Sequence, residues 1–183
     1  RVEHKPLPQC EIIDMRQELK RGNRSIFSLR LQELMEDRLS KHQQIMLFLN
    51  RRGISGFISC RSCGNVLQCP HCDVSLSQHE GGRMVCHYCG YEEPLPKVCP
   101  SCGSPFLGAF KAGTQKIEQM VKKRFPGARV MRMDYDTTRT KDSYEKILKT
   151  FANQEADILI GTQMIVKGHD FPNVTLVGVL AAD

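Results

Sequence analysis

Helical stripes of apolar residues alternate with short apolar runs through most of this chain. Three segments, 28–41, 114–125 and 142–152, repeat apolar positions at intervals of three and four, which predicts amphipathic helices, the first with Ser28 as N-cap. Four runs, 45–49, 128–133, 157–161 and 174–180, are short, apolar and predict buried strands. The helical stripes are Leu31, Leu34, Met35 and Leu39; Ile117, Met120 and Val121; and Tyr144, Ile147, Leu148 and Phe151.

This alternation predicts an α/β fold, a parallel sheet flanked by helices. Ligands of such sheets bind at the carboxyl ends of the strands. Polar segments follow three of the predicted strands: residues 50–53, 134–138 and 161–163. Each alone is typical of a surface loop, but together they favour a functional edge.

A cysteine-rich segment interrupts this pattern. Eight of the nine cysteines form four Cys-x-x-Cys pairs, while Cys10 stands apart and is expected to be a plain, non-ligating residue. Eight thiolates in bidentate pairs match two tetrahedral four-cysteine zinc sites, and a disulfide framework would suit a small secreted chain better. The pairs are Cys60/Cys63, Cys69/Cys72, Cys86/Cys89 and Cys99/Cys102.

The spacing of the pairs favours nested sites. Thirteen residues separate Cys72 from Cys86, with Gly81 and Gly82 near the middle, which predicts a hairpin that returns the third pair to the second. The first pair then joins the fourth, although spacing leaves a crossed arrangement open. Site one would hold Cys60, Cys63, Cys99 and Cys102, and site two would hold Cys69, Cys72, Cys86 and Cys89.

Four thiolates fill each site, so no position is left for a catalytic water and the metals are expected to be structural. His71 and His87 are therefore not expected to be ligands, and Tyr88 and Tyr91 are expected to pack against the cysteine pairs. Iron is the chemical alternative to zinc, with electron transfer as its function. Two zinc ions that displace eight protons would lower the formal charge from +6 to +2, so global charge is weak evidence for nucleic-acid binding.

The sequence contains no Gly-x-x-x-x-Gly-Lys-Ser/Thr loop, no catalytic triad motif and no apolar run long enough to cross a membrane. It starts without Met and ends just after a strand-like run, so we expect a segment of a longer protein.

Three features together resemble the PriA family of bacterial replication-restart DNA helicases, which belong to superfamily 2. They are the strand that ends at residues 50–53, the eight-cysteine segment, and residues 161–172 (GTQMIVKGHDFP). The resemblance spans almost the whole chain. It implies a RecA-like helicase lobe 2 with an inserted zinc-ribbon subdomain, divided into residues 1–24 (leading segment), 25–53 (lobe 2), 54–110 (insert) and 111–183 (lobe 2 continued).

The resemblance also implies roles for particular residues. Thr162, in the likeness of helicase motif V, would contact a DNA phosphate, while Gly168 and Asp170 would face the nucleotide. Arg51 and Arg52, in the likeness of motif IV, would meet the DNA backbone. The family's metal pairing is the nested one.

The whole protein is then expected to be an ATP-dependent 3′-to-5′ helicase that uses ATP and Mg²⁺ besides two zinc ions, restarts stalled forks and loads the primosome. Its partners would be forked or single-stranded DNA, primosome proteins and single-strand-binding proteins, in a cytoplasmic, nucleoid-associated, monomeric protein without membrane contact. Because the Walker A loop and motif VI would lie outside this sequence, we expect the segment to be inactive alone. The alternative is a non-enzymatic zinc-ribbon module on an α/β scaffold that binds DNA or protein.

Overall fold

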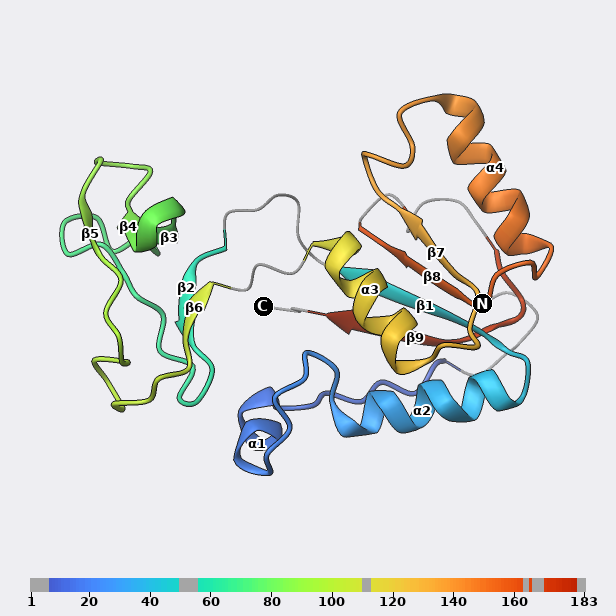
Figure 1. Ribbon diagram of the computed structural model, residues 1–183, viewed down its shortest axis with the longest axis horizontal. Helices are drawn as coiled ribbons and strands as arrows, with labels where there is room; N and C mark the ends of the chain where they lie inside the picture. Colours follow the sequence, from blue (N-terminus) through green and yellow to red (C-terminus); the bar gives the residue numbers. More distant parts are fainter. Residues whose placement is uncertain (1–6, 50–55, 110–112, 163–164, 166–169, 181–183) are drawn as a thin grey trace.

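The chain forms a parallel sheet with helices on both faces and a separate small insert, as Figure 1 shows. The computed structural model describes residues 7–49, 56–109, 113–162, 165 and 170–180. Strands β1 (Gln44–Leu49), β7 (Val130–Met133), β8 (Ile158–Gly161) and β9 (Val174–Leu180) lie in the order β7-β8-β1-β9, and all neighbouring pairs are parallel. The predicted fold class is therefore confirmed.

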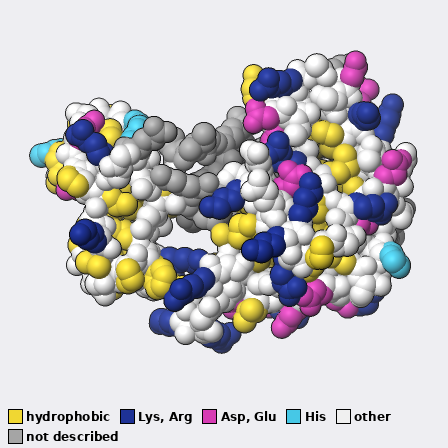
Figure 2. Space-filling model, viewed as in Figure 1, with side chains coloured by type: hydrophobic (Ala, Val, Ile, Leu, Met, Phe, Trp, Pro, Cys, Tyr) yellow, Lys and Arg dark blue, Asp and Glu magenta, His cyan; other side chains and the backbone are white. Residues whose placement is uncertain are grey.

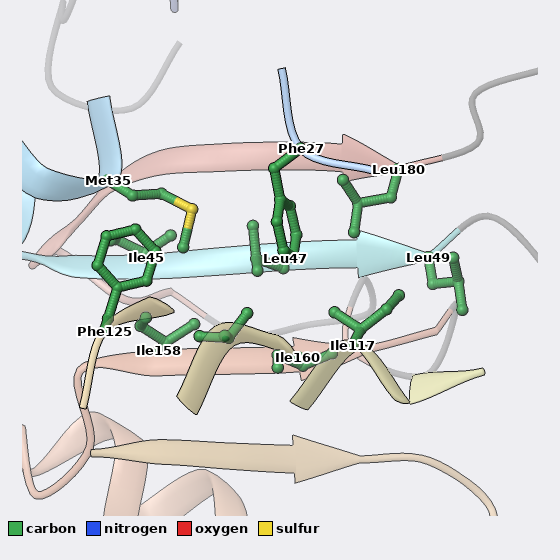
Figure 3. Close-up of a cluster of buried hydrophobic side chains, with 11 residues drawn as sticks. Phe27, Met35, Ile45, Leu47, Leu49, Ile117, Phe125, Ile158, Ile160 and Leu180 are labelled. Atoms are coloured by element: carbon green, nitrogen blue, oxygen red, sulfur yellow. The ribbon is translucent and has the colours of Figure 1, made fainter. Parts of the chain in front are cut away.

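Two helices cover one face of this sheet. Helix α2 (Leu29–Ser40) has Ser28 as its N-cap, as predicted, and the Ser28 side chain accepts the Leu31 N–H. Helix α3 (Thr114–Arg124) packs beside α2. Alternate residues of β1 and β8 point towards these helices, so that one apolar cluster fills the space between the two layers (Figure 3). Its buried members are Phe27, Met35, Ile45, Leu47, Leu49, Ile117, Val121, Phe125, Ile158, Ile160 and Leu180.

Helix α4 (Lys141–Ala152) covers the opposite face. Thr140 caps it in a reciprocal capping box with Ser143. The predicted stripe of α4 packs on the intervening sheet residues, and the Phe151 ring meets Phe171 edge-on with centroids 5.1 Å apart. The buried members of this second cluster are Met133, Leu148, Phe151, Ala156, Leu159 and Ile165.

Helix α1 (Met15–Lys20) precedes α2 and was not predicted from the sequence. Its one buried residue is Glu18, whose Oε2 accepts the backbone N–H of Leu29 at 2.7 Å and the Nδ2–H of Asn23 at 2.7 Å. The hydrogen bond from Leu29, at the N-terminus of α2, lowers the pKa of Glu18. The carboxylate therefore ties α1 to the start of α2.

The insert contains two small antiparallel sheets. Strands β2 (Ile58–Cys60) and β6 (Leu107–Ala109) pair at its base, and β3 (Ser77–Gln78), β4 (Arg83–Val85) and β5 (Glu92–Pro94) form a meander beyond them. The chain turns between β3 and β4 at Gly81 and Gly82, as the predicted hairpin required. All these strands lie within the predicted boundaries of 54–110. In the part of the chain that the structure describes, no helix has the length and apolar character that crossing a membrane requires.

Candidate functional site

The four Cys-x-x-Cys pairs share one backbone geometry. In each pair the first cysteine's carbonyl accepts the N–H of the residue four positions on, at 2.8–3.1 Å, and its own N–H donates to the carbonyl five positions on, at 2.7–2.8 Å. The residue directly after each pair has a positive φ, which glycine and aspartate tolerate. These residues are Gly64 (81°), Asp73 (54°), Gly90 (77°) and Gly103 (69°).

The structure brings the eight thiols together in the nested arrangement. Two clusters form, Cys60, Cys63, Cys99 and Cys102 (the outer site) and Cys69, Cys72, Cys86 and Cys89 (the inner site), and the Sγ atoms within each lie within 4.8 Å of one another. The Sγ–Sγ separations include 3.6 Å for Cys60–Cys102, 3.8 Å for Cys63–Cys99 and 3.5 Å for Cys69–Cys89. A tetrahedron with Zn–S bonds of about 2.3 Å has edges of about 3.8 Å. The two clusters therefore fit zinc.

The pKa values of the cysteine thiols in each cluster also favour the binding of a divalent cation. Burial disfavours the Cys60 thiolate, but N–H groups of Cys63 and Ser62 outweigh it and lower the pKa of Cys60 to about 7. The Ser104 N–H favours the Cys102 thiolate, but neighbouring thiol groups and burial raise the pKa of Cys102 to about 12.

The inner site repeats this contrast. The N–H of Cys89 lowers the pKa of Cys86 to about 7, whereas contact with the Cys89 thiol raises the pKa of Cys72 to about 12. Four crowded thiols cannot all ionise unless a cation offsets their charge. In both sites the metal would supply that charge.

The aromatic neighbours of the sites divide into two groups. Tyr91 packs against the insert's apolar cluster and meets His71 edge-on at 5.2 Å between ring centroids, as expected. Tyr88 is 83% exposed, so the expectation that it packs against its cysteine pair is wrong. His87 pairs with His79, their Nε2 atoms 3.2 Å apart, and lies outside both cysteine clusters.

The second candidate region is the carboxyl edge of the parallel sheet. The strand register pairs Gly161 of β8 with both Phe48 of β1 and Met133 of β7, so the carboxyl ends of the three strands lie at one edge. Thr162 directly follows β8, is half-buried, and its carbonyl accepts the Ile165 N–H at 3.1 Å. Asp170 is exposed. Arg51, Arg52 and Gly168 lie outside the described residues.

Asp134, directly after β7, is engaged inside the protein. One carboxylate oxygen accepts the N–H groups of Asp136 and Thr137 at 3.0 Å each, and the other accepts the Thr114 hydroxyl and lies 3.0 Å from Arg132 Nε. Burial disfavours the carboxylate, but the Thr114 hydroxyl and these other partners outweigh it and lower the pKa of Asp134. Asp134 thus fixes the first turn of α3 at the same edge and has a structural role.

Gly161 is required by close packing beside Thr162. A Cβ there would lie 2.6 Å from the Met133 carbonyl oxygen and would overlap the Ile165 side chain. We expect Gly161→Ala to lower the free energy of unfolding by about 1–3 kcal/mol in urea titrations followed by circular dichroism. Gly127→Ala is the matched control, because nothing lies within 4 Å of its added Cβ. Equal stability of the two variants would contradict this packing.

Comparisons with known proteins agree with this architecture. Residues 69–94 match the family "PriA DNA helicase Cys-rich region (CRR) domain", and residues 109–183 match "Helicase conserved C-terminal domain". The whole chain is 55% identical over 184 residues to the replication restart protein PriA of Bacillus subtilis and 53% identical over 188 residues to that of Synechocystis. PriA of Chlamydia muridarum is 44% identical over 96% of the chain.

The chain spans only about a quarter of the length of these relatives, 23% of the first two and 24% of the third. Within that span, the Cys-rich match contains the inner cysteine pairs, and the helicase match contains strands β7, β8 and β9 of the sheet. The chain therefore belongs to the PriA family of replication restart proteins, as a segment that carries a Cys-rich zinc-ribbon region and a helicase C-terminal domain.

Proposed function

We propose that this chain supplies one face of the DNA and nucleotide sites of an ATP-dependent 3′-to-5′ helicase that restarts stalled forks and loads the primosome. The observation that carries the proposal is the strand register, which places the carboxyl ends of β1, β7 and β8 at one sheet edge. Parallel α/β sheets bind their ligands at this edge. Thr162 would contact a DNA phosphate, and Gly168 and Asp170 would face ATP and Mg²⁺, with Arg51 and Arg52 on the DNA backbone.

Charge on the surface supports a nucleic-acid partner. Figure 2 shows Lys and Arg side chains over the middle and lower part of the viewed face, where the insert and the sheet domain approach each other. Such groups bind phosphate without reading bases. We therefore assign forked or single-stranded DNA as the ligand, the two zinc sites as structural, and primosome and single-strand-binding proteins as further partners. The segment alone, which has no Walker A loop in its sequence, would not turn over ATP.

The test uses the full-length protein with Thr162→Ala and Asp170→Asn. We expect each variant to bind two zinc ions and to unwind a 3′-tailed fork at least about tenfold more slowly, a loss of about 1.4 kcal/mol in transition-state stabilisation. Thr175→Ala is the matched control, since Thr175 is an exposed residue of β9, the last strand in the order among the described residues.

Unchanged unwinding by both variants would favour the alternative, a non-enzymatic zinc-ribbon module on a scaffold. Phosphate release by the isolated 183-residue segment with single-stranded DNA provides a second check. Robust turnover there would overturn the assignment of the segment as inactive alone.

A further inference from the structure

Arg61 occupies the position after the first cysteine of its pair, where two of the other three pairs have proline (Pro70 and Pro100). Its Nη1–H donates to the carbonyl of Arg24 at 2.7 Å, and its Nη2–H donates to the carbonyl of Ser25. These two carbonyls lie in the loop between α1 and α2, outside the insert. The guanidinium of a zinc-site residue therefore binds the sheet domain.

The loop presents its carbonyls independently of Arg61. Asn23 Oδ1 accepts the Ser25 N–H at 2.9 Å, Asn23 Nδ2–H donates to the Phe27 carbonyl at 2.9 Å, and Ser25 Oγ accepts the Phe27 N–H at 3.0 Å. These local bonds fix residues 23–27. Two consecutive carbonyls held in this way form an acceptor pair that suits the forked, planar guanidinium and not a single ammonium group.

The same loop is anchored to the sheet domain. Phe27 is 2% exposed and belongs to the cluster beneath α2 and α3. Glu18 links Asn23 to the Leu29 N–H through its carboxylate. Residues 14–28, which we call the α1 segment, are therefore anchored to the sheet domain.

Two more side chains of the α1 segment contact residues close to the outer site. The Arg24 guanidinium carbon lies 5.5 Å from the ring centroid of Phe106, which follows the fourth cysteine pair. Arg16 packs over Gly64, its Nη1 3.5 Å from where a Cβ would be. The α1 segment thus contacts the first cysteine pair at Arg61 and Gly64 and the stretch after the fourth pair at Phe106. In Figure 1, α1 lies beside the lower loops of the insert, below β2 and β6.

We propose that Arg61 is a positioning residue that docks the outer zinc site on the α1 segment, and that docking and zinc binding at this site stabilise each other. Arg61 lies between two ligands, so a bound metal fixes the turn from which its side chain extends. Binding linkage is reciprocal, so the contact that zinc favours must in turn favour zinc. Inner-site residues make none of these contacts, so the effect is confined to the outer site. The use of this docking to hold the insert against forked DNA rests on the proposed function.

The experiment follows amide hydrogen exchange of the zinc-loaded, full-length protein after addition of a chelator. We expect Arg61→Ala to speed loss of protection about tenfold in the outer pairs (60–64 and 99–104) and to leave the inner pairs (69–73 and 86–90) unchanged. Arg61→Lys should give an intermediate rate, because one ammonium group serves two carbonyls poorly. Arg83→Ala is the matched control, an exposed arginine of the insert that pairs only with Glu92 among the described ion pairs.

Wild-type rates in Arg61→Ala, or equal acceleration at both sites, would overturn the docking proposal. If Arg61→Ala does not fold, two other variants replace it in the same experiment. Arg61→Lys weakens the contact from the side of the insert, and Asn23→Ala weakens it from the side of the loop, because it removes the hydrogen bonds that hold the loop. This readout needs no helicase activity. A wild-type protein that fails to unwind forks would therefore overturn the proposed function and leave the docking result standing.

Discussion

Removal of both zinc ions is expected to unfold the insert and to leave the parallel sheet folded. The insert's apolar core is small: its buried members are Ile58, Leu67, Leu76 and Met84, with two of the metal-site cysteines. Its strands are two or three residues long. Structural zinc contributes about 10–16 kcal/mol of apparent folding free energy in small domains, as much as the whole stability of a typical domain. The sheet has two core clusters of its own, so its folding does not depend on the free energy of zinc binding.

Hydrogen exchange before and after complete chelation measures this difference. We expect the amides of Gly64, Asp73, Gly90 and Gly103 to lose protection, because their hydrogen bonds exist only inside the cysteine pairs. Amides of β1 and β8 should keep theirs. Cys69→Ser should lower the bound zinc from two to one, whereas Cys10→Ser, at an exposed cysteine outside both clusters, should keep two. Protection that survives chelation would contradict a zinc-dependent insert.

Acid should have the same effect as chelation. Cys72 and Cys102 have pKa values raised to about 12 in the metal-free sites, so each site still holds at least one proton at neutral pH that zinc must displace. Metal binding therefore releases protons, and the affinity for zinc falls as the pH falls. The insert is expected to lose protection at a higher pH than the sheet.

The periodicity of apolar residues was enough to predict most of the sheet domain, because the residues buried in its two cores are the apolar ones. The stripes of α3 and α4 and the strand β8 are apolar residues at helical or strand spacing, and they form the two cores. Helix α1 could not be found in this way, because its buried residue is the charged Glu18. Glu18 holds this helix in place by accepting hydrogen bonds from Asn23 and Leu29. A pattern of apolar residues cannot reveal such polar contacts.

The metal sites show a similar division. Spacing and Gly81-Gly82 favoured nested pairing, and the antiparallel pairing of β2 with β6 brings the first and fourth cysteine pairs together. Arg61 gave only one signal in the sequence, its place where two other pairs have proline. Its partners are backbone carbonyls, which every residue type has, so the contact depends on loop geometry alone. The exposure of Tyr88 likewise depends on which way its turn faces.

Gln44→Glu is expected to destabilise the sheet domain more than Gln44→Leu. Gln44 is 3% exposed at the start of β1, and its Nε2 donates to the carbonyls of Phe151 at 2.7 Å and Ala156 at 2.8 Å. These bonds join the end of α4 to the start of β8. Leucine would remove both donors, at a cost of about 1–3 kcal/mol. Glutamate would place an acceptor against two carbonyls, and an unpaired buried charge costs about 3–5 kcal/mol.

The two substitutions differ in their dependence on pH. Burial and two facing carbonyls would raise the folded-state pKa of a glutamate at position 44 above its unfolded value. The folded state would then bind the proton more tightly, so the variant gains stability as the pH falls through that folded pKa and is weakest at high pH. Protonation also restores one O–H donor for one of the two carbonyls.

Urea unfolding of the zinc-loaded protein at several pH values, followed by circular dichroism, measures the free-energy difference between Gln44→Glu and Gln44→Leu. The pH dependence of zinc binding is common to both variants, so it cancels when one free energy of unfolding is subtracted from the other. The glutamate variant should be the weaker at pH 8, and the gap should narrow as the pH is lowered. A gap that is zero at every pH would mean that the stability at position 44 depends on the shape of the side chain and not on its charge. A gap that narrows with acid would show that a charge at position 44 is buried against acceptors, as the Phe151 and Ala156 carbonyls require, a setting that its spacing in the sequence cannot reveal.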